Sequence, residues 1–397
     1  MEWKSQDRIK TMTRDLTELT VDDMAGFFRH FVSEVANSAL YAALCPLIAE
    51  DPVALSMYTN VPGTQRRPNL LLAALHCSVL RDQSHSFADW FKTVGGTREA
   101  NDPELKSVLS TFIAERLDEL TDLVTKGATQ TNEVGRSALV LPALAELGAE
   151  QSKPIAIVEI GTSAGLNLRP DAYAINYKIA DGIFTTVGPK DSPVHIETDS
   201  SQSLEPLPFS AIEALRLGSR IGVDLNPLDP TDEFQARWLC SLIWPDDTAR
   251  FLRLRAALNY AAAQPIPLVK GDAVATVGAH IASVPAQEYP VVVTTWVLTY
   301  LTEPQRRAFS DVLDQAAQTR DFAWIAMEHP AYANGLPWPE RVTAAWGSQS
   351  LDPAMQTIIK SGTPLVVHRY RNGVRSSQWI ASVHAHGHWI NWHPVLI

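Results

Sequence analysis

A short apolar run that ends in an acid and two glycines is the first feature of the sequence that could do chemistry. Residues 155–168 read IAIVEIGTSAGLNL, which places Glu159, Gly161 and Gly165 at a fixed spacing. Gly161 would let the chain turn sharply and a ligand approach, and Gly165 would let a helix start close to the strand. A pyrophosphate-binding loop needs G-x-G-x-x-G, whereas the spacing here is G-x-x-x-G. An acid beside the loop repels phosphate and suits a ligand with an ammonium group.

Acids also follow two other apolar runs. Asp224 closes the run in RIGVDLNPLD, and Asp272 follows the run in LVKGDAV. In an open parallel sheet, ligands bind outside the carboxyl ends of the strands. Asp224 could accept hydrogen bonds from both hydroxyls of a ribose, and Asp272 could accept one from an adenine amine. Together with an ammonium group at Glu159, this pattern predicts S-adenosylmethionine (SAM) as the cofactor. Asp181 is the competing ribose acid, but Asp224 has the clearer context of a strand followed by a turn.

These residues need a parallel sheet to bring them together, and the second part of the chain has the pattern of one. From Pro154 onward, apolar runs alternate with helical stretches, at residues 155–160, 219–225, 266–272, 289–296 and 322–328. Alternating strands and helices predict an α/β domain whose parallel sheet has helices on both faces. After residue 360, two strands around RNGVRSS predict a C-terminal antiparallel hairpin. An insert at about 170–218 contains material for a small pair of strands.

The first part of the chain has a helical pattern throughout. TVDDMAGFFRHFVSEVANS carries an apolar helical stripe, PNLLLAALHCSVLRD is apolar on nearly all sides, and a third helix opens at Asp102 and Pro103. We therefore expect two domains. Residues 1–150 form a helical domain that covers the site and shapes the substrate pocket, and residues 151–397 form the α/β domain.

Four segments carry a resemblance to a known family: TQTNEVGRSALVLPAL, EIGTSAGLNL, GVDLNPLDP and the ending HGHWINW. They resemble a bacterial family of uncharacterised proteins that joins a helical N-terminal domain to a class I SAM-dependent methyltransferase-like domain. The resemblance covers nearly the whole chain and implies a Rossmann-like fold. Methyltransferases place the ribose acid about 20 residues after the glycine loop. Asp224 lies much later in this chain, because residues 170–218 are inserted.

The segment TQTNEVGR gathers four polar side chains ahead of the first predicted strand. Its following helix should border the methionine end of SAM. Arg136 could then pair with the SAM carboxylate, Asn132 could bind the substrate, and Glu133 could act as a catalytic group facing it. The alternative is a helix cap at Thr131 or Asn132 with solvated charges.

Aromatic and histidine side chains follow the fourth and fifth predicted strands. His329 could take a proton from the acceptor, since the reference pKa of histidine is about 6.5. Trp296 and Tyr300 could stack on adenine or on an aromatic substrate. A structural histidine before a proline turn and plain burial of the two aromatic rings are the alternatives.

Three alternating histidines near the C-terminus are a candidate metal site. On one strand, His384, His386 and His388 would point to one face and could hold zinc or iron. No acid or cysteine accompanies them in the sequence, and Gly387 suggests that the strand ends there. We therefore expect no bound metal.

The composition excludes several classes of protein. The net charge is −11 and no block of Lys and Arg is present, which argues against nucleic acid as the main partner. No apolar run approaches the roughly 20 residues that span a membrane, and the three scattered cysteines favour a reducing cytoplasm. We predict a cytoplasmic SAM-dependent methyltransferase for a small-molecule substrate, with a homodimer as an open question. The alternatives are a SAM fold with chemistry other than methyl transfer, or a non-catalytic binding module.

Overall fold

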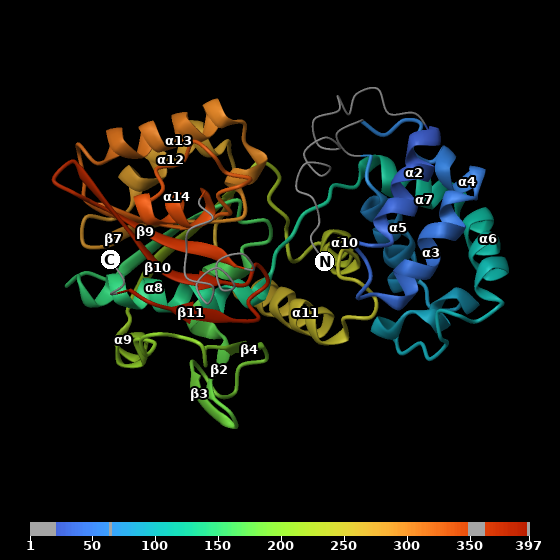
Figure 1. The fold of residues 1–397 in the computed structure, drawn as a ribbon, viewed down its shortest axis with the longest axis horizontal. Helices are drawn as coiled ribbons and strands as arrows, with labels where there is room; N and C mark the ends of the chain where they lie inside the picture. The colour runs from blue at the N-terminus through green and yellow to red at the C-terminus, as the bar shows by residue number, and fades with distance from the viewer. Residues whose placement is uncertain (1–20, 63–65, 348–361, 395–397) are drawn as a thin grey trace. The chain divides into compact units, whose positions relative to one another are not determined.

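The computed structural model describes residues 21–62, 66–347 and 362–394, and the chain divides into two compact units (Figure 1). The helical unit is Met1–Thr131 together with Asp232–Arg255, and the sheet unit is Asn132–Thr231 together with Ala256–Ile397. This division differs from the boundary at residue 150 that the sequence suggests. Residues 132–150 belong to the sheet unit, and a segment from the middle of the chain returns to the helical unit.

The helical unit is built from helices within its described residues. They are α2 (Val21–Phe31), α3 (Ala39–Ala49), α4 (Pro52–Ser56), α5 (Pro68–Arg81), η3 (Ser86–Trp90), η4 (Lys92–Val94), α6 (Leu105–Glu115), α7 (Leu117–Lys126), α10 (Glu233–Ser241) and the start of α11 (Thr248–Ala263). The predicted buried helix is confirmed, because every side chain of α5 from Leu70 to Val79 is buried. The third predicted helix is two helices, since Arg116 leaves helical geometry between α6 and α7.

Side-chain contacts explain why residues 232–255 join the helical unit. Trp238 on α10 is buried in the helical core, and its Nε1–H donates to the carbonyl of Ala128 at 2.9 Å. The ring nitrogens of His76 on α5 lie 3.1 Å from the carbonyl of Ser241 and 2.8 Å from Thr93 Oγ1. Burial lowers the pKa of His76 to about 4, so this histidine is a neutral structural residue.

The sheet unit contains an eight-stranded, mostly parallel sheet in the order β11-β10-β9-β8-β7-β1-β5-β6. The strands are β1 (Ile155–Ile160), β5 (Leu217–Asp224), β6 (Leu268–Lys270), β7 (Tyr289–Thr295), β8 (Phe322–Met327), β9 (Thr363–Arg371), β10 (Val374–Val383) and β11 (Ile390–Trp392). The strands β6, β5, β1, β7 and β8 are parallel, and β9 to β11 are antiparallel to their neighbours. The predicted mixed α/β class with a C-terminal hairpin is confirmed.

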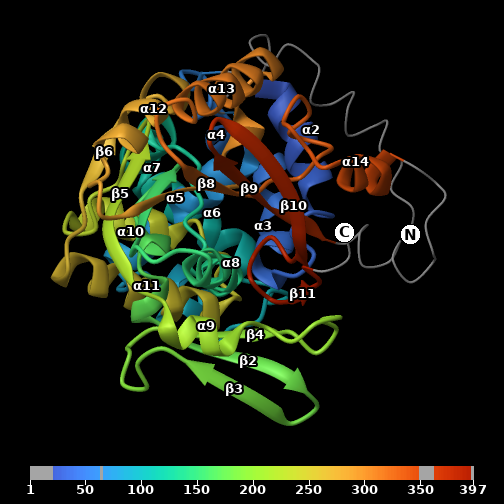
Figure 2. The same ribbon diagram turned by 90° about the vertical axis from the view of Figure 1, so that its left-hand side faces the viewer.

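The central strand β1 lies between β5 and β7, where the order of the strands reverses. Ile160 is opposite Val223 on one side and Thr294 on the other. Ala156, Val158 and Ile160 pack in one core with α12 (Ala273–Ser283) and α13 (Glu303–Ala316). Figure 1 and Figure 2 show these two helices on one side of the sheet and α8 (Ser137–Ala149) on the other.

The insert forms a small sheet of three strands rather than the expected pair. Its strands are β2 (Ala174–Ala180), β3 (Ile183–Val187) and β4 (His195–Asp199), and β2 pairs antiparallel with β3 and parallel with β4. Two tyrosine hydroxyls attach this sheet to the rest of the unit. Tyr177 donates to the carbonyl of Ala138 on α8, and Tyr173 donates to that of Leu166, both at 2.6 Å.

The remaining short elements are η5 (Val134–Arg136), η6 (Leu166–Leu168), η7 (Pro170–Ala172), α9 (Phe209–Ala214), η8 (Leu298–Tyr300) and α14 (Glu340–Gly347). Of the helices in the described residues, none has the length and apolar character to cross a membrane.

Candidate functional site

The glycine loop after β1 has the geometry that its glycines suggest. Gly161 and Gly165 have φ angles of 74° and 68°, in the left-handed region that favours glycine. A Cβ on Gly161 would lie 2.2 Å from Val297 Cγ2, and one on Gly165 would lie 2.6 Å from Leu268 Cδ2. The expected helix after Gly165 is wrong: the loop leads into the three-residue turn η6. The glycines are therefore required by the protein's own packing, before any ligand is considered.

Two side chains hold this loop from different directions. Asn132 Oδ1 accepts backbone hydrogen bonds from Ala164 at 3.2 Å and from Leu166 at 3.3 Å. Asp224, at the end of β5, accepts from the backbone N–H of Ser163 at 2.8 Å through Oδ2 and from that of Asn226 at 2.9 Å through Oδ1. The structure thus places Asn132 and Asp224 beside the glycine loop, where both act on its backbone.

The acid on β1 is buried. Glu159 accepts a hydrogen bond from Thr162 Oγ1 at 2.6 Å. Burial raises its pKa to about 7, against the lowering effects of the bond from Thr162 and the charge of Arg136. A carboxyl group in this state changes its protonation near neutral pH, and a cationic ligand would favour the ionised form.

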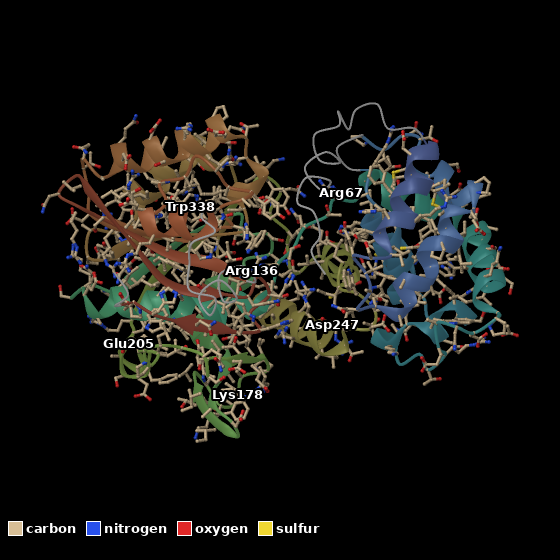
Figure 3. The ribbon with its side chains drawn as sticks, in the orientation of Figure 1. Arg67, Arg136, Lys178, Glu205, Asp247 and Trp338 are labelled. Carbon is tan, nitrogen blue, oxygen red and sulfur yellow. The ribbon has the colours of Figure 1, made fainter. Side chains whose placement is uncertain are left out.

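Arg136, labelled in Figure 3, belongs to η5. Its side chain is buried and contacts the last residue of β7, the strand between β1 and β8. Its Nη1 donates to the carbonyl of Thr295 at 2.9 Å, and its Nε donates to that of Ala385 at 3.0 Å. Its positive charge lowers the pKa values of both Glu159 and Glu328. The guanidinium is thus a cation shared by two buried acids on the strands that flank β7, since Glu159 lies on β1 and Glu328 directly follows β8.

Glu328, directly after β8, is a site residue that the sequence analysis did not single out. Its Oε1 accepts backbone hydrogen bonds from Val297 at 3.1 Å and from Leu298 at 3.2 Å. Its side chain is fully buried, and this burial raises its pKa to about 7. Its Oε2 has no hydrogen-bond partner in the described part of the chain. The sequence pattern that could have identified Glu328 is an acid that comes after an apolar run, as Glu159 does.

The aromatic residues at the ends of β7 and β8 form a cluster. Trp296 has a φ of 56°, which is a strained conformation for a bulky residue. Its ring centroid is 6.0 Å from that of His329 and 6.2 Å from that of Tyr332. Burial lowers the pKa of His329, so its imidazole is neutral at neutral pH. Tyr300 is 76% exposed, so burial does not account for this residue.

The two candidate acids beyond the glycine loop have different positions. Asp272 lies two residues after β6, and its Oδ1 caps α12 by accepting from the backbone N–H of Ala275 at 2.9 Å. Since Asp224 pairs with Lys270 in register, Asp272 lies at the same edge of the sheet as Asp224. Asp181 lies in the turn between β2 and β3 and forms an ion pair with Lys178 at 3.1 Å. It therefore belongs to the small sheet and not to the edge that carries Glu159.

The three histidines do not share a strand, because β10 ends at Val383 and they lie in the connection to β11. The rings of His384 and His388 stack with centroids 4.3 Å apart. His386 Nδ1 is 3.6 Å from Glu133 Oε2, and Glu133 Oε1 caps η5 by accepting from Gly135 N–H at 3.0 Å. Across residues 21–62, 66–347 and 362–394, no group of three or more potential ligands has the arrangement to hold a metal ion.

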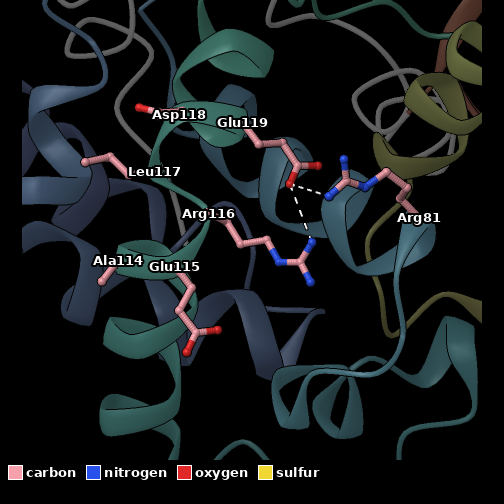
Figure 4. Close-up of a pocket in the computed structure, with 7 residues that line it drawn as sticks. All are labelled: Arg81, Ala114, Glu115, Arg116, Leu117, Asp118 and Glu119. Carbon is pink, nitrogen blue, oxygen red and sulfur yellow. Dashed lines mark hydrogen bonds and ion pairs between the residues drawn. The ribbon is translucent and has the colours of Figure 1, made fainter.

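The helical unit has a hollow of about 670 Å³, shown in Figure 4, which is lined by Arg81, Ala114, Glu115, Arg116, Leu117, Asp118 and Glu119. Three of its charged groups, Arg81, Arg116 and Glu119, form ion pairs with one another. Glu119 is 2.7 Å from Arg81 and 3.7 Å from Arg116, and Arg116 also donates to Asp82 at 2.5 Å. We therefore regard the ion pairs around this hollow as structural contacts at the junction of α6 and α7, and we do not assign a ligand site to it.

The fold and the site define a mixed α/β protein with buried polar side chains at the carboxyl edge of a mostly parallel sheet. The chain belongs to the family described as uncharacterized proteins conserved in bacteria (DUF2332), whose sequence model matches residues 26–392. This confirms the expected membership of an uncharacterised bacterial family. Searches of curated proteins and of solved structures found no match to the chain.

Proposed function

We propose that this protein is a SAM-dependent methyltransferase with a Rossmann-like class I fold and a small-molecule acceptor. One observation carries the proposal. Glu159 and Asp224 lie at the carboxyl ends of the adjacent parallel strands β1 and β5, Asp272 follows the next strand, β6, and the Gly161–Gly165 loop lies at the point where the strand order reverses. Open α/β sheets bind nucleotide-like ligands at such a reversal.

The residues present fit the parts of SAM. Glu159 is a buried acid whose raised pKa reflects an uncompensated cost of burial, and an ammonium group would offset that cost. The carboxylate oxygens of Asp224 each accept one backbone hydrogen bond and retain a lone pair for a ribose hydroxyl. Asp272 uses Oδ1 to cap α12, which leaves Oδ2 for the adenine amine. Arg136 would pair with the carboxylate of the methionine end.

When bound, SAM would supply the methyl group, and the chain would bind, orient and deprotonate the acceptor. Glu328 Oε2 and the imidazole of His329, both directly after β8, are the groups that could take the acceptor's proton. Burial raises the pKa of Glu328 to about 7 and lowers the pKa of His329, which leaves the imidazole neutral and able to accept a proton. Trp296 and Tyr300 would bind the acceptor or the adenine. Alignment and exclusion of water would supply much of the rate enhancement.

The two buried glutamates favour one alternative, namely acid–base chemistry at the same site without methyl transfer. Each has a pKa of about 7, which suits proton transfer at neutral pH. The mass of the product distinguishes the two reactions, because only methyl transfer adds one methyl group to the acceptor. The proposed setting is the cytoplasm, which the three free and buried cysteines favour.

Calorimetric titration with SAM and with its demethylated product tests the proposal. We expect one molecule of either ligand to bind per chain. If neither ligand binds to the folded protein, the proposal is wrong. A screen of small acceptors, read by product mass, should follow a positive result.

A further inference from the structure

A cavity of about 290 Å³ in the sheet unit is lined by none of the residues that we assign to SAM or to the acceptor. Its lining residues are Ala164, Arg169, Pro227, Leu228, Asp229, Pro230, Thr231, Ala261, Pro265, Ile266 and Leu268. Ala164 belongs to the glycine loop, residues 227–231 follow β5, and residues 265–268 lead into β6. Most of these side chains are prolines and aliphatic residues, so the wall is largely apolar.

Arg169 is the cation of this wall, and it is only 3% exposed. Its Nη1 donates to the carbonyl of Gly165 at 2.7 Å, and its Nη2 donates to that of Gln264. Its buried Nε has no hydrogen-bond partner in the described residues. Within the same part of the chain, no acidic side chain forms an ion pair with Arg169. The buried Glu159 attracts Arg169 electrostatically but forms no ion pair with it. A buried charge without a counter-ion in contact is costly, so an anion from outside would be favoured here.

The neighbouring arginine shows the contrast. Arg220 donates to both oxygens of Asp171, at 2.7 Å and 2.6 Å, so its charge is compensated within the chain. The acid on the cavity wall is Asp229, which is exposed and whose Oδ1 accepts from the backbone N–H and the hydroxyl of Thr231. Its repulsion of an anion is therefore screened by solvent. Arg169 is thus a buried cation that faces an apolar cavity.

We propose that this cavity binds a small carboxylic acid with a hydrocarbon body, with the carboxylate on Arg169 and the hydrocarbon against Leu228 and Ile266. A guanidinium presents planar donors that match a carboxylate. The Nε–H of Arg169 and the second N–H of one of its terminal nitrogens would donate two parallel hydrogen bonds to the carboxylate of the ligand. The volume is at the lower end of the roughly 300–1,000 Å³ of small-molecule sites, so the acid has about the size of benzoate. Since Arg169 also holds the carbonyl of Gly165, the bound acid would stabilise the glycine loop.

The test titrates the full chain with benzoate by calorimetry, without SAM. Benzyl alcohol serves as the neutral ligand of similar shape, and inorganic phosphate serves as the anion without hydrocarbon. We expect benzoate to bind at least tenfold more tightly than either. Equal binding of the three probes, or no binding of benzoate, overturns the proposal. Neither result bears on the SAM titration, so the two proposals fail separately.

Two variants and a matched control locate the site. Arg169→Gln should weaken benzoate binding at least tenfold, whereas Arg220→Gln should weaken it much less, because Arg220 does not line the cavity and affects Arg169 only through its charge and its bond to the carbonyl of Leu168. Arg169 also bonds to two backbone carbonyls, so its replacement perturbs folding as well. Ile266→Trp keeps the arginine and fills the cavity from a half-buried position, and it should abolish binding. Wild-type affinity in a folded Arg169→Gln or Ile266→Trp protein overturns the assignment.

Discussion

The carboxylate of Asp224 accepts a hydrogen bond from the backbone N–H of Ser163 at 2.8 Å, although 61 residues separate them in the chain. This bond joins the glycine loop after β1 to the end of β5. The second oxygen of Asp224 accepts from Asn226, so one carboxylate orients two loops. A residue expected to contact the ribose directly therefore also fixes the backbone around it.

Asp224→Asn should weaken SAM binding by about 1.5–3 kcal/mol, the usual loss for a hydrogen bond to a charged group. An amide has only one acceptor oxygen, so it cannot accept from a ribose hydroxyl and from both Ser163 and Asn226. Calorimetry measures the affinity. Asp229→Asn is the matched control, because Asp229 also accepts within its own loop, from Thr231. Equal SAM affinities for the two variants would show that Asp224 does not contact the cofactor.

Gly161→Ala should lower the free energy of unfolding by about 3 kcal/mol, because left-handed strain of about 1–2 kcal/mol adds to overlap with Val297. Gly182→Ala isolates the strain, since Gly182 has a φ of 71° and nothing within 4 Å of its added Cβ. It should cost about 1–2 kcal/mol, the strain alone. In Gly161→Ala, the further change Val297→Ala should recover part of the loss. Denaturant unfolding of the wild type, Gly161→Ala, Val297→Ala and the double variant gives the four values of the cycle, and strict additivity of the double variant would refute the overlap.

Glu328→Gln should stabilise the protein at pH 8 and have little effect near pH 4.5. The pKa of Glu328 rises from 4.5 to about 7 on folding, so between these values the folded protein holds a proton that the unfolded chain has released. The free energy of unfolding therefore falls as the pH rises through this window, by up to about 3 kcal/mol at roughly 1.4 kcal/mol per pKa unit. The glutamine oxygen can still accept from Val297 and Leu298.

Unfolding of this variant in denaturant at pH 4.5, 6, 7 and 8 measures the effect. Glu205→Gln is the control, because Glu205 is exposed. A stability difference from wild type that does not change with pH would contradict the buried, protonated state of Glu328.

Arg136→Ala should weaken SAM binding by about 1.5–3 kcal/mol, as expected for a charge-assisted hydrogen bond to the cofactor carboxylate. Glu133→Gln should leave SAM affinity unchanged and slow turnover, if Glu133 also acts on the acceptor. Its glutamine oxygen can still cap η5 at Gly135. SAM titration and steady-state rates compare the two variants. Wild-type binding and turnover in both would reduce the segment TQTNEVGR to a structural support.

Purified protein should carry no stoichiometric metal, and a chelator should not lower its activity. The histidines 384, 386 and 388 lie in a connection rather than on one strand, and two of their rings stack on each other. Elemental analysis checks the metal content. One zinc or iron per chain would bring the connection between β10 and β11 into the active site.

Much of the local structure could be predicted because buried strands and helices leave a periodic pattern in nearby residues. The runs at 289–296 and 322–328 match β7 (Tyr289–Thr295) and β8 (Phe322–Met327) to within one residue. Both strands are buried on both faces, so their apolar runs are continuous. The loop glycines Gly161 and Gly165 were also visible, since left-handed backbone selects for glycine.

The tertiary structure alone decided what depends on distant partners. The sequence does not show that Trp238 packs with residues 110 positions earlier, that β2 pairs with β4 in parallel, or that Asn132 holds the glycine loop. The ionisation of Glu159 and Glu328 is decided in the same way, because a pKa depends on burial and on charges such as Arg136 that come from elsewhere in the chain. Periodicity is a property of neighbouring residues, whereas strand pairing, capping and burial of charge arise only when separate segments meet.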